Sequence, residues 1–467
     1  MIIMPIKRNS DSANMVIKQI NERYGEAKPD GTRQTVISKA SNAGALEILR
    51  LPSDILVADI ATGGGIPIGK VTGIVGPYSS GKTLLAMKYV VSAQHTCRYC
   101  KTRLSEKTGK IVLNKKTGEV RDVRDFLSID DDFWVMALSD KKTKKFAKIA
   151  FKSLFEDEDS EESKSARKSL RDLMKGENLF FEEDIVYDCK CGKSEPMRVL
   201  WIDIEGTFDP VWAKKVGVDI EELVVSEPSA AEHAVDQTIH VINSGEYDLC
   251  VLDSLGNFIT IDDIDKSAEE NSMISGAAKL VNRFQRRMSA AMTSKRNIND
   301  PFQPVCSIIQ INHVTTRIKK SPMDFGPSTV RPGGVVQEYN ESLTLHMSNA
   351  KYDSHEDPKF VDIGFRTVKN KTFPPKKVAS FKFWLKDDSR SGVFSGNTEE
   401  EKTVIKYAID GGIINKVGAK SPYSYEYKDL KMTSESGFIE HLKQNSSLFR
   451  EIRDKTFLKF VERSLEG

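Results

Sequence analysis

The chain has 467 residues, enough for two or three domains and a large buried core. Charged residues make up 29%, but the formal net charge of +2 excludes a basic field over the whole surface, so any contact with nucleic acid must come from local patches. No apolar run is long enough to cross a bilayer and the N-terminus lacks the apolar stretch of a secretory signal, so we expect a soluble, cytoplasmic protein with no membrane partner.

A short helix is predicted near the N-terminus. Apolar residues recur at close to helical spacing from Met15 to Tyr24, and Gly25 can end the helix. We interpret residues 1–47 as an arm ahead of the core, for polymerisation or for binding a partner, with a mobile terminus as the alternative.

A buried strand, a glycine-rich turn and a helix are predicted over residues 71–91. Inside this stretch, GPYSSGKT matches the P-loop pattern G-x-x-x-x-G-K-T. Gly76 and Gly81 let the backbone wrap a phosphate chain, Lys82 would reach the outer phosphates, and the Thr83 hydroxyl would ligate Mg²⁺. A chance glycine turn is the alternative, but the complete pattern in this context favours a nucleotide site.

A long polar segment, assigned to residues 97–195, then interrupts the core. It begins with the pair Cys97 and Cys100 and ends with the pair Cys189 and Cys191. Four thiolates in two knuckles suit structural Zn²⁺, although the second pair has an unusual one-residue gap. We predict a zinc clip, with free thiols or a redox pair as the alternative. The segment also predicts a hairpin in KIVLNKKTGEV, with its turn at residues 116–118, and a basic helix in SKSARKSLRDLMKG.

Apolar strands resume at MRVLWIDIE and alternate with helical stretches, which predicts a mostly parallel sheet covered on both faces. YDLCVLDS places Asp253 at the end of a buried strand, as a second anchor for Mg²⁺. Glu205 ends its own strand and is the candidate general base, with Asp203 as a competitor. Cys250 and Cys306 lie in apolar strands and are expected in the core.

Two polar loops follow core strands, at about residues 257–276 and 314–334. A solvated surface loop is the usual fate of such composition, but the length of the second loop favours function. Its basic side chains would contact phosphates and Ile318 would insert between bases. The first loop is acidic, so its contacts would come from the helix after it. The candidate nucleic-acid-contacting residues of the second loop are Arg317, Ile318, Lys319, Lys320 and Arg331, and the helix after the first loop carries Lys279, Arg283 and Arg286 on one face.

The composition changes again at about Thr398. A helix ends at Gly411 and Gly412, a tyrosine-rich turn or hairpin follows, and two helices close the chain. We interpret residues 398–467 as a small separate α/β domain.

Six stretches of the chain carry a resemblance to a known family: DILVADIATGGGIPIGKVTGIVGPYSSGKT, WIDIEGTFDPVWAKKVGVDIEELVVSEP, VLDSLGNF, IIQINH, RPGGVVQEY and FRTVKNKTFPPKKVASF. They occur in the order seen in the RecA family of recombinases, and the chain resembles a bacteriophage form of that family, of the UvsX type, with a zinc-binding insertion. The resemblance implies a RecA-type α/β P-loop ATPase core, with a mostly parallel twisted sheet flanked by helices, over residues 48–96 and 196–397. The arm, the insertion and the C-terminal domain are added to it.

The resemblance also implies roles for single residues. The phosphates and Mg²⁺ would be held by Gly76, Ser79, Ser80, Gly81, Lys82, Thr83 and Asp253. Catalysis would involve Glu205, Lys82, Lys369, Lys371 and His313, of which the lysine pair would reach the nucleotide of an adjacent subunit. The adenine would meet Asp209 and Trp212, where the family usually has tyrosine for the second. His313 stands where the bacterial form has glutamine, and Lys279 and Arg286 stand where the family has DNA-contacting arginines.

The resemblance implies a DNA-dependent ATPase that forms a helical filament on single-stranded DNA and catalyses homologous pairing and strand exchange. Its cofactors would be ATP, Mg²⁺ and structural Zn²⁺. Its partners would be single- and double-stranded DNA, further copies of the chain, and single-strand-binding and loader proteins. If the protein is phage-encoded, it would act in the bacterial host cytoplasm. The alternatives are a hexameric DNA helicase, a zinc-bearing recombination-mediator ATPase of the same fold, and a non-enzymatic DNA scaffold.

Overall fold

The protein is described from a computed structural model. The described residues are 10–24, 48–114, 120–122, 179–265, 275–296, 302, 305–316, 329–388, 393–418 and 423–466. Two compact units are present: Met1–Lys101 with Glu195–Gly467, and Thr102–Ser194. The turn predicted at 116–118 and the basic helix predicted in SKSARKSLRDLMKG lie outside the described residues. In the described part of the chain, no helix is long and apolar enough to span a membrane.

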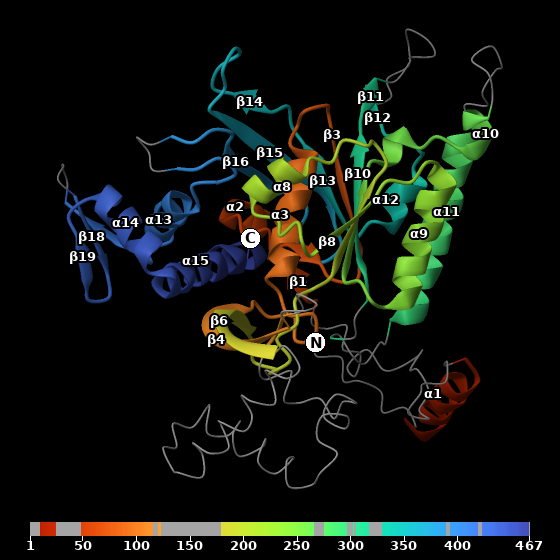
Figure 1. Ribbon diagram of the computed structural model, residues 1–467, viewed down its shortest axis with the longest axis horizontal. Coiled ribbons are helices and arrows are strands. Elements are labelled where there is room, and N and C mark those ends of the chain that lie inside the picture. Colours follow the sequence, from red (N-terminus) through yellow and green to blue (C-terminus); the bar gives the residue numbers. More distant parts are fainter. Residues whose placement is uncertain are drawn as a thin grey trace, which may run out of the picture. The chain divides into compact units, whose positions relative to one another are not determined.

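The larger unit is built on a nine-stranded sheet in the order β14-β15-β13-β3-β10-β9-β7-β8, with β16 paired to β15 (Figure 1). The pairs among β13, β3, β10, β9, β7 and β8 are all parallel, whereas β15 runs antiparallel to β13, β14 and β16. The strands are β3 (Val71–Gly76), β7 (Val199–Asp203), β8 (Leu223–Ser226), β9 (Leu249–Asp253), β10 (Ser307–His313), β13 (Leu343–Met347), β14 (Lys351–Tyr352), β15 (Phe360–Asn370) and β16 (Val378–Trp384). The predicted mostly parallel sheet is confirmed.

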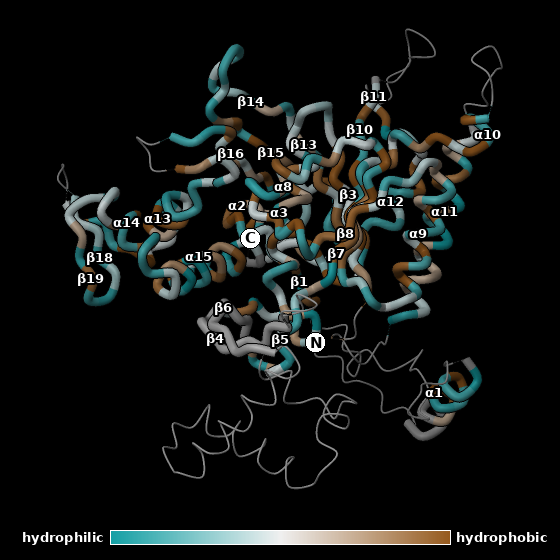
Figure 2. Tube along the Cα trace, in the orientation of Figure 1, coloured by the Kyte–Doolittle hydropathy of each residue, from teal (hydrophilic) through white to brown (hydrophobic). Residues whose placement is uncertain are grey.

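Helices cover both faces of this sheet (Figure 1). They are α3 (Lys82–Gln94), α8 (Pro210–Val216), α9 (Ala231–Ser244), α11 (Ser275–Lys295) and the short α12 (Val336–Asn340). The strand residues alternate between two hydrophobic clusters, because successive side chains of a strand point to opposite faces. Trp201 packs with α3 and α8, whereas Leu200 and Ile202 pack with α9 and α11. Figure 2 shows the central strands as the most apolar part of the unit, as expected for a sheet buried on both faces.

The remaining elements of the larger unit are short or terminal. They are α1 (Ser10–Tyr24), β1 (Arg50–Leu51), α2 (Leu56–Thr62), β2 (Ile66–Pro67), η3 (Leu255–Asn257), α10 (Ile261–Ile264), β11 (Thr315–Thr316) and β12 (Thr329–Val330). Helix α1 forms where the sequence predicts one. Strands β11 and β12 pair with each other and form an antiparallel stem.

A small C-terminal sheet follows the core, as expected from the sequence. Its order is β17-β18-β19, and its elements and the helices around it are α13 (Glu400–Asp410), β17 (Asn415–Val417), β18 (Ser424–Tyr427), β19 (Leu430–Met432), α14 (Glu435–Gln444) and α15 (Ser446–Glu466). These elements share a hydrophobic cluster, which Leu56 of α2 also joins. An ion pair between Arg453 and the buried Asp59, at 2.6 Å, also joins α15 to α2.

The smaller unit is a three-stranded antiparallel sheet in the order β5-β4-β6. It consists of β4 (Ser105–Asn114), β5 (Val120–Asp122) and β6 (Leu179–Asp188). The β4–β5 pair runs from Ile111 opposite Asp122 to Leu113 opposite Val120. The predicted hairpin is therefore confirmed.

Candidate active site

A cavity of about 380 Å³ lies beside the turn between β3 and α3. Gly81 precedes α3 with a φ of 83°, and a Cβ atom there would lie 2.7 Å from Ile363 Cδ1, so a side chain would be both strained and crowded. No side chain caps the first turn of α3, so its N–H groups are available to an anion. The cavity is lined by Tyr78, Ser79, Ser80, Gly81, Lys82, Thr83, Leu84, Glu205, Thr207, Trp212, Asp253, His313, Ala350, Tyr352, Val361, Ile363 and Leu385.

Lys82 folds back onto this phosphate-binding loop. Its Nζ donates a hydrogen bond to the Pro77 carbonyl at 2.6 Å. Burial lowers the pKa of Lys82, while the carboxylates of Asp253 and Glu205 oppose that shift. The oxygen atoms of a bound phosphate would offer this ammonium a charged acceptor in place of the carbonyl.

Thr83 and Asp253 form the expected pair for a magnesium ion. The Thr83 hydroxyl donates to Asp253 Oδ2 at 2.9 Å, and Asp253 is only 5% exposed. Burial, together with the neighbouring charge of Glu205, raises the pKa of Asp253 to about 7 against the lowering effect of the bond from Thr83. A hydroxyl beside a carboxylate offers the oxygen ligands that Mg²⁺ prefers, so the residues present fit this ion.

Glu205 lines the same cavity and is held by two side chains. Its Oε1 accepts a hydrogen bond from the Ser254 hydroxyl and lies 2.9 Å from His313 Nε2. Burial raises the pKa of Glu205, but the hydrogen bonds from Ser254 and His313 outweigh burial and hold it below its ordinary value. The carboxylate is therefore ionised at neutral pH, as a base that orients a water molecule must be.

The structure separates the two acidic residues that compete for this role. Asp203 is 2% exposed and accepts hydrogen bonds from the main-chain N–H groups of Glu205, Gly206 and Phe208, at 3.2, 3.0 and 2.7 Å. All of these bonds stabilise the turn after β7. Asp203 therefore shapes the loop that carries Glu205.

Trp212 and Asp209, the two residues expected at the adenine, differ in what their side chains contact. Trp212 lines the cavity and packs edge-on against Phe383, with ring centroids 6.0 Å apart. Asp209 instead caps α8 by accepting from the main-chain N–H groups of Val211 and Trp212, at 2.8 and 3.1 Å. Asp209 thus orients the helix that carries Trp212.

Sequence reasoning missed two tyrosines of this cavity. Tyr78 lines the cavity and is 87% exposed. Because it lies inside the P-loop pattern, the sequence could have predicted its position beside the nucleotide. Tyr352 lies on β14 and is 48% exposed. No sequence signal points to it, because its place depends on the pairing of β14 with β15.

Lys369 and Lys371 do not line this cavity. They lie at the end of β15, where Lys369 Nζ donates to the Glu338 carbonyl and Lys371 Nζ donates to the Tyr339 carbonyl at 3.2 Å. Both acceptors are main-chain oxygens of α12. The structure therefore places this pair away from the phosphate loop of its own chain.

Asn312 connects the end of β10 to the segment after β12. Its side chain is fully buried, and Nδ2 donates to the Pro332 carbonyl at 3.1 Å and to Gln337 Oε1 at 2.9 Å. The neighbouring His313 reaches Glu205. The two consecutive residues thus contact the nucleotide cavity on one side and the base of the second polar loop on the other.

The candidate DNA-contacting residues fall into three groups. Lys279 and Arg286 lie on α11, and Lys279 lines a cavity of about 250 Å³ beside α10. The side chain of Arg331 is only 7% exposed and is paired with Glu341. A DNA contact from Arg331 would require that pair to open. Outside the described residues lie Arg317, Ile318, Lys319 and Lys320.

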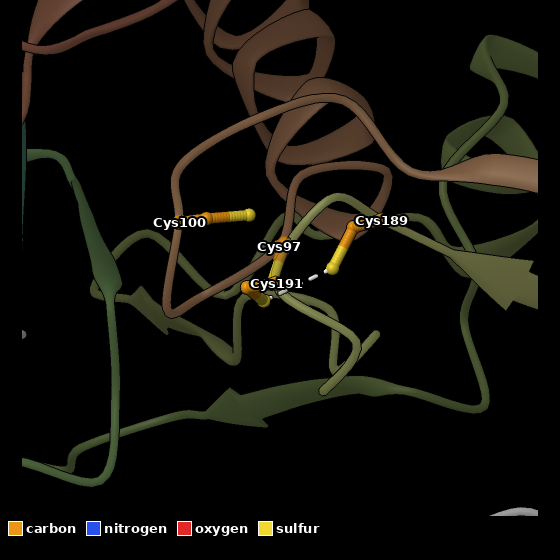
Figure 3. Close-up of side chains that lie close together, drawn as sticks. All are labelled: Cys97, Cys100, Cys189 and Cys191. Atoms are coloured by element: carbon orange, nitrogen blue, oxygen red, sulfur yellow. Dashed lines mark hydrogen bonds between the residues drawn. The ribbon is translucent and has the colours of Figure 1, made fainter.

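The four clustered cysteines converge (Figure 3), with all their sulfur atoms within 4.8 Å of one another. The sulfurs of Cys189 and Cys191 are 3.1 Å apart. Cys97 is buried and Cys191 is exposed. Four sulfur donors at such separations suit a tetrahedral Zn²⁺ site, so the residues fit the predicted ion. Cys250 and Cys306 are both buried in the core, as expected.

An ion cluster fixes the first cysteine pair to the sheet. Arg98 Nε lies 3.2 Å and Lys101 Nζ 3.3 Å from the carboxylate of Asp248, and all three side chains are nearly inaccessible to solvent. Asp248 also accepts from the main-chain N–H of Arg198 at 3.1 Å. Since Asp248 directly precedes β9, the turn that carries Cys97 and Cys100 is anchored to the strand that ends at Asp253.

The fold and the cavity define a P-loop nucleotide-binding protein of the α/β class. The phosphate loop joins a central parallel strand, β3, to a helix. At the same edge of the sheet, Glu205 follows β7 and Asp253 ends the neighbouring β9. Within this class, the chain belongs to the RecA family. The family model for the RecA N-terminal domain matches residues 12–121 and 188–388.

Known relatives agree with this assignment at a distance. The chain is 27% identical over 264 residues to Protein RecA of Mycoplasmopsis pulmonis, a match that covers 56% of this chain and 69% of the relative. It is 29% identical over 266 residues to Protein RecA of Streptococcus equi subsp. zooepidemicus, covering 56% and 64%. It is 28% identical over 263 residues to Protein RecA of Corynebacterium glutamicum, covering 56% and 62%. The matches thus span about two thirds of the length of these relatives.

Proposed function

We propose that the protein is a DNA-dependent ATPase that assembles as a filament on single-stranded DNA and catalyses homologous pairing and strand exchange. One observation carries the proposal. In a chain of the RecA family, the Thr83–Asp253 pair and the Glu205–His313 contact face one cavity beside the phosphate loop. This is the residue set that phosphoryl transfer to water needs.

Each residue of the cavity has a distinct task in this proposal. The N–H groups of the phosphate loop and Lys82 hold the phosphates, and Thr83 and Asp253 hold Mg²⁺, which neutralises charge that develops on the phosphates. Glu205 orients a water molecule and accepts its proton. Trp212 and Tyr352 enclose the apolar side of the cavity, where an adenine ring would lie.

The lysine pair supports a site completed by a second protomer. Lys369 and Lys371 point their ammonium groups to carbonyls of α12 and are absent from their own chain's cavity. Cations supplied across an interface stabilise charge on a transferred phosphoryl group, as arginine fingers do. We therefore propose that they serve the nucleotide of a neighbouring protomer, which makes ATP turnover depend on filament assembly.

DNA would contact the side of the sheet that carries the two polar loops. Lys279, Arg283 and Arg286 lie on α11 within two helical turns. The basic residues of the second loop, Arg317, Lys319 and Lys320, with Ile318 between them, belong to the same proposed surface. Phosphate contacts from such a surface make binding strongly dependent on salt.

The cysteine cluster is proposed to hold one structural Zn²⁺. Its support is the convergence of four sulfur atoms and the buried anchoring of the first pair through Asp248. The insertion and the asparagine–histidine pair at residues 312–313 favour a bacteriophage form of the family, acting in the bacterial host cytoplasm with single-strand-binding and loader proteins.

ATP turnover with and without single-stranded DNA tests the proposal, together with imaging of the complexes. We expect DNA to stimulate turnover, filaments to form with ATP, and Lys82→Ala to abolish turnover while Lys214→Ala, an exposed lysine on α8, leaves it intact. Turnover that is indifferent to DNA, or that survives Lys82→Ala, would contradict the proposal. Closed rings in place of filaments would favour a hexameric helicase.

A further inference from the structure

Glu341 is a fully buried carboxylate outside the nucleotide cavity, between the end of α12 and the start of β13. Its Oε1 accepts a hydrogen bond from Arg331 Nη2, and its Oε2 accepts one from the Thr344 hydroxyl at 2.7 Å. Arg331 directly follows β12. The carboxylate therefore fixes the end of the β11–β12 stem to the central sheet.

The same carboxylate lies against the strand that leads to the phosphate loop. Gly73 of β3 is the Cα partner of Thr344, and a Cβ atom at Gly73 would lie 2.3 Å from Glu341 Oε1. Glycine therefore leaves the space that the Glu341 side chain fills. Since β3 ends at Gly76, the first glycine of the phosphate loop, a shift of Glu341 bears directly on the strand that positions this loop.

On its other side, Glu341 acts on the lysine pair. Thr344 is the Cα partner of Lys369 in the β13–β15 pair. Burial and the neighbouring Lys371 lower the pKa of Lys369, and the charges of Glu341 and Glu338 oppose this shift. Three functional parts thus meet at one buried carboxylate: the loop stem, the phosphate-loop strand and the lysine pair.

The pair between Arg331 and Glu341 is incompletely bonded. Among the described residues, Arg331 Nε and Nη1 are buried without a hydrogen-bond partner. Buried guanidinium N–H groups without acceptors cost free energy, so stability alone does not account for this arrangement. Arg331, Thr344 and Lys369 also line a common cavity of about 360 Å³, which leaves room for the pair to rearrange.

We infer that Glu341 is a positioning residue that couples the β11–β12 stem to β3 and Lys369, so that a displacement of the stem on DNA binding changes the ATP site. The inference rests on the proposed function, because it assumes DNA beside the stem and ATP at the phosphate loop. In this inference Glu341 affects the phosphate loop through β3, whereas the Glu205–His313 contact connects to the second polar loop through β10.

The first test replaces Glu341 by glutamine, which removes the charge and keeps the size. We expect stimulation of ATP turnover by single-stranded DNA to fall by at least about fivefold, while DNA-free turnover changes by less than about twofold. Glu246→Gln is the control, because Glu246 is a 62% exposed carboxylate that pairs with Arg198 and does not line this cavity, and it should leave stimulation unchanged. An equal loss of DNA-free and DNA-stimulated turnover would overturn the inference.

A second pair of variants separates coupling from folding. The double substitution Arg331→Met with Glu341→Leu replaces a buried ion pair by apolar side chains, which commonly preserves stability. We expect its Tm to match or exceed that of the wild type and its stimulation by DNA to remain lost. Recovery of stimulation together with Tm would show a purely structural pair and overturn the inference.

The contact with β3 has its own test. Gly73→Ala should lower both the Tm and the stimulation by DNA because its Cβ displaces Glu341, and adding Glu341→Ser should restore part of the Tm while stimulation stays lost. Absence of any recovery of the Tm would contradict the contact between Glu341 and β3. If the wild type shows no stimulation by DNA, the proposed function fails with the inference; if it shows stimulation that Glu341→Gln leaves intact, only the inference fails.

Discussion

His313 Nε2 lies 2.9 Å from Glu205 Oε1, and these two residues come from the ends of different strands. The contact joins the candidate base to β10, where the adjacent Asn312 is bonded to Pro332 at the end of the second polar loop and to Gln337 of α12. The position of the base is thereby tied to the position of that loop.

Glu205→Gln should lower ATP turnover by at least about 100-fold and leave nucleotide binding intact, because an amide orients water but does not accept its proton. Glu246→Gln is a suitable control. Glu246 is 62% exposed and pairs with Arg198, which directly precedes β7 at the end of that strand opposite to Glu205. Steady-state turnover and nucleotide titration measure the two effects. Loss of binding in parallel with turnover would contradict the assignment.

The dependence of turnover on pH tests the same assignment of Glu205 as the base. Burial raises the pKa of Glu205, but the bonds from Ser254 and His313 outweigh it, so the net shift is downward. A base works when deprotonated, so protonation of Glu205 should limit turnover only as pH drops through this lowered pKa. Ser254→Ala removes one lowering bond and should move the acid limb of the profile to higher pH.

His313→Gln should retain more of the stimulation by DNA than His313→Ala, because glutamine keeps a donor within reach of Glu205. We expect the alanine variant to lose about tenfold in stimulated turnover. The ratio of turnover with and without single-stranded DNA measures this loss. Equal behaviour of the two variants would show that the hydrogen bond to Glu205 carries no coupling.

The cysteine cluster should bind one zinc ion per chain. Cys189→Ser should abolish stoichiometric zinc, whereas Cys250→Ser, at a buried cysteine outside the cluster, should retain it. Elemental analysis of protein purified without chelator measures the zinc content. Protein that holds no metal, or that keeps its zinc after Cys189→Ser, would refute the site.

Glu400→Gln should stabilise the protein, and the gain should grow with pH. Glu400 accepts from the main-chain N–H of Leu56 at 2.6 Å, and its Oε2 is buried without a hydrogen-bond partner among the described residues. Burial raises the pKa of Glu400 to about 8. The folded state therefore binds a proton that the unfolded state releases at lower pH, so this group destabilises the fold as pH rises from its unfolded pKa to about 8.

Thermal unfolding of wild type and Glu400→Gln at several pH values measures this effect. The variant should be more stable by roughly 1–3 kcal/mol near pH 8 and nearly equal to wild type at acidic pH. The difference should stay constant above pH 8, since both states of the wild type are then ionised. A difference independent of pH would contradict the buried protonated carboxyl.

The sequence predicts the parts of the site that depend on local patterns. The phosphate loop, Asp253 and Glu205 follow or end apolar strands, so their common edge of the sheet can be predicted before the structure is known. The choice between Asp203 and Glu205 as the base cannot be predicted in this way. It depends on the main-chain N–H groups of the following turn, which donate hydrogen bonds to Asp203.

Contacts between distant segments explain what the sequence does not predict. Arg331 reads as a free basic residue of a polar loop, but the space beside Gly73 lets Glu341 pair with it inside the protein. Tyr352 enters the cavity only because β14 pairs with β15, which no pattern in the chain indicates.

Formation of joint molecules between a single strand and homologous supercoiled duplex DNA tests the central claim most directly. We predict joint molecules that require ATP and homology and that are lost in Lys82→Ala. Unwinding of a forked duplex without any joint molecules would contradict the claim and favour a helicase of the same fold.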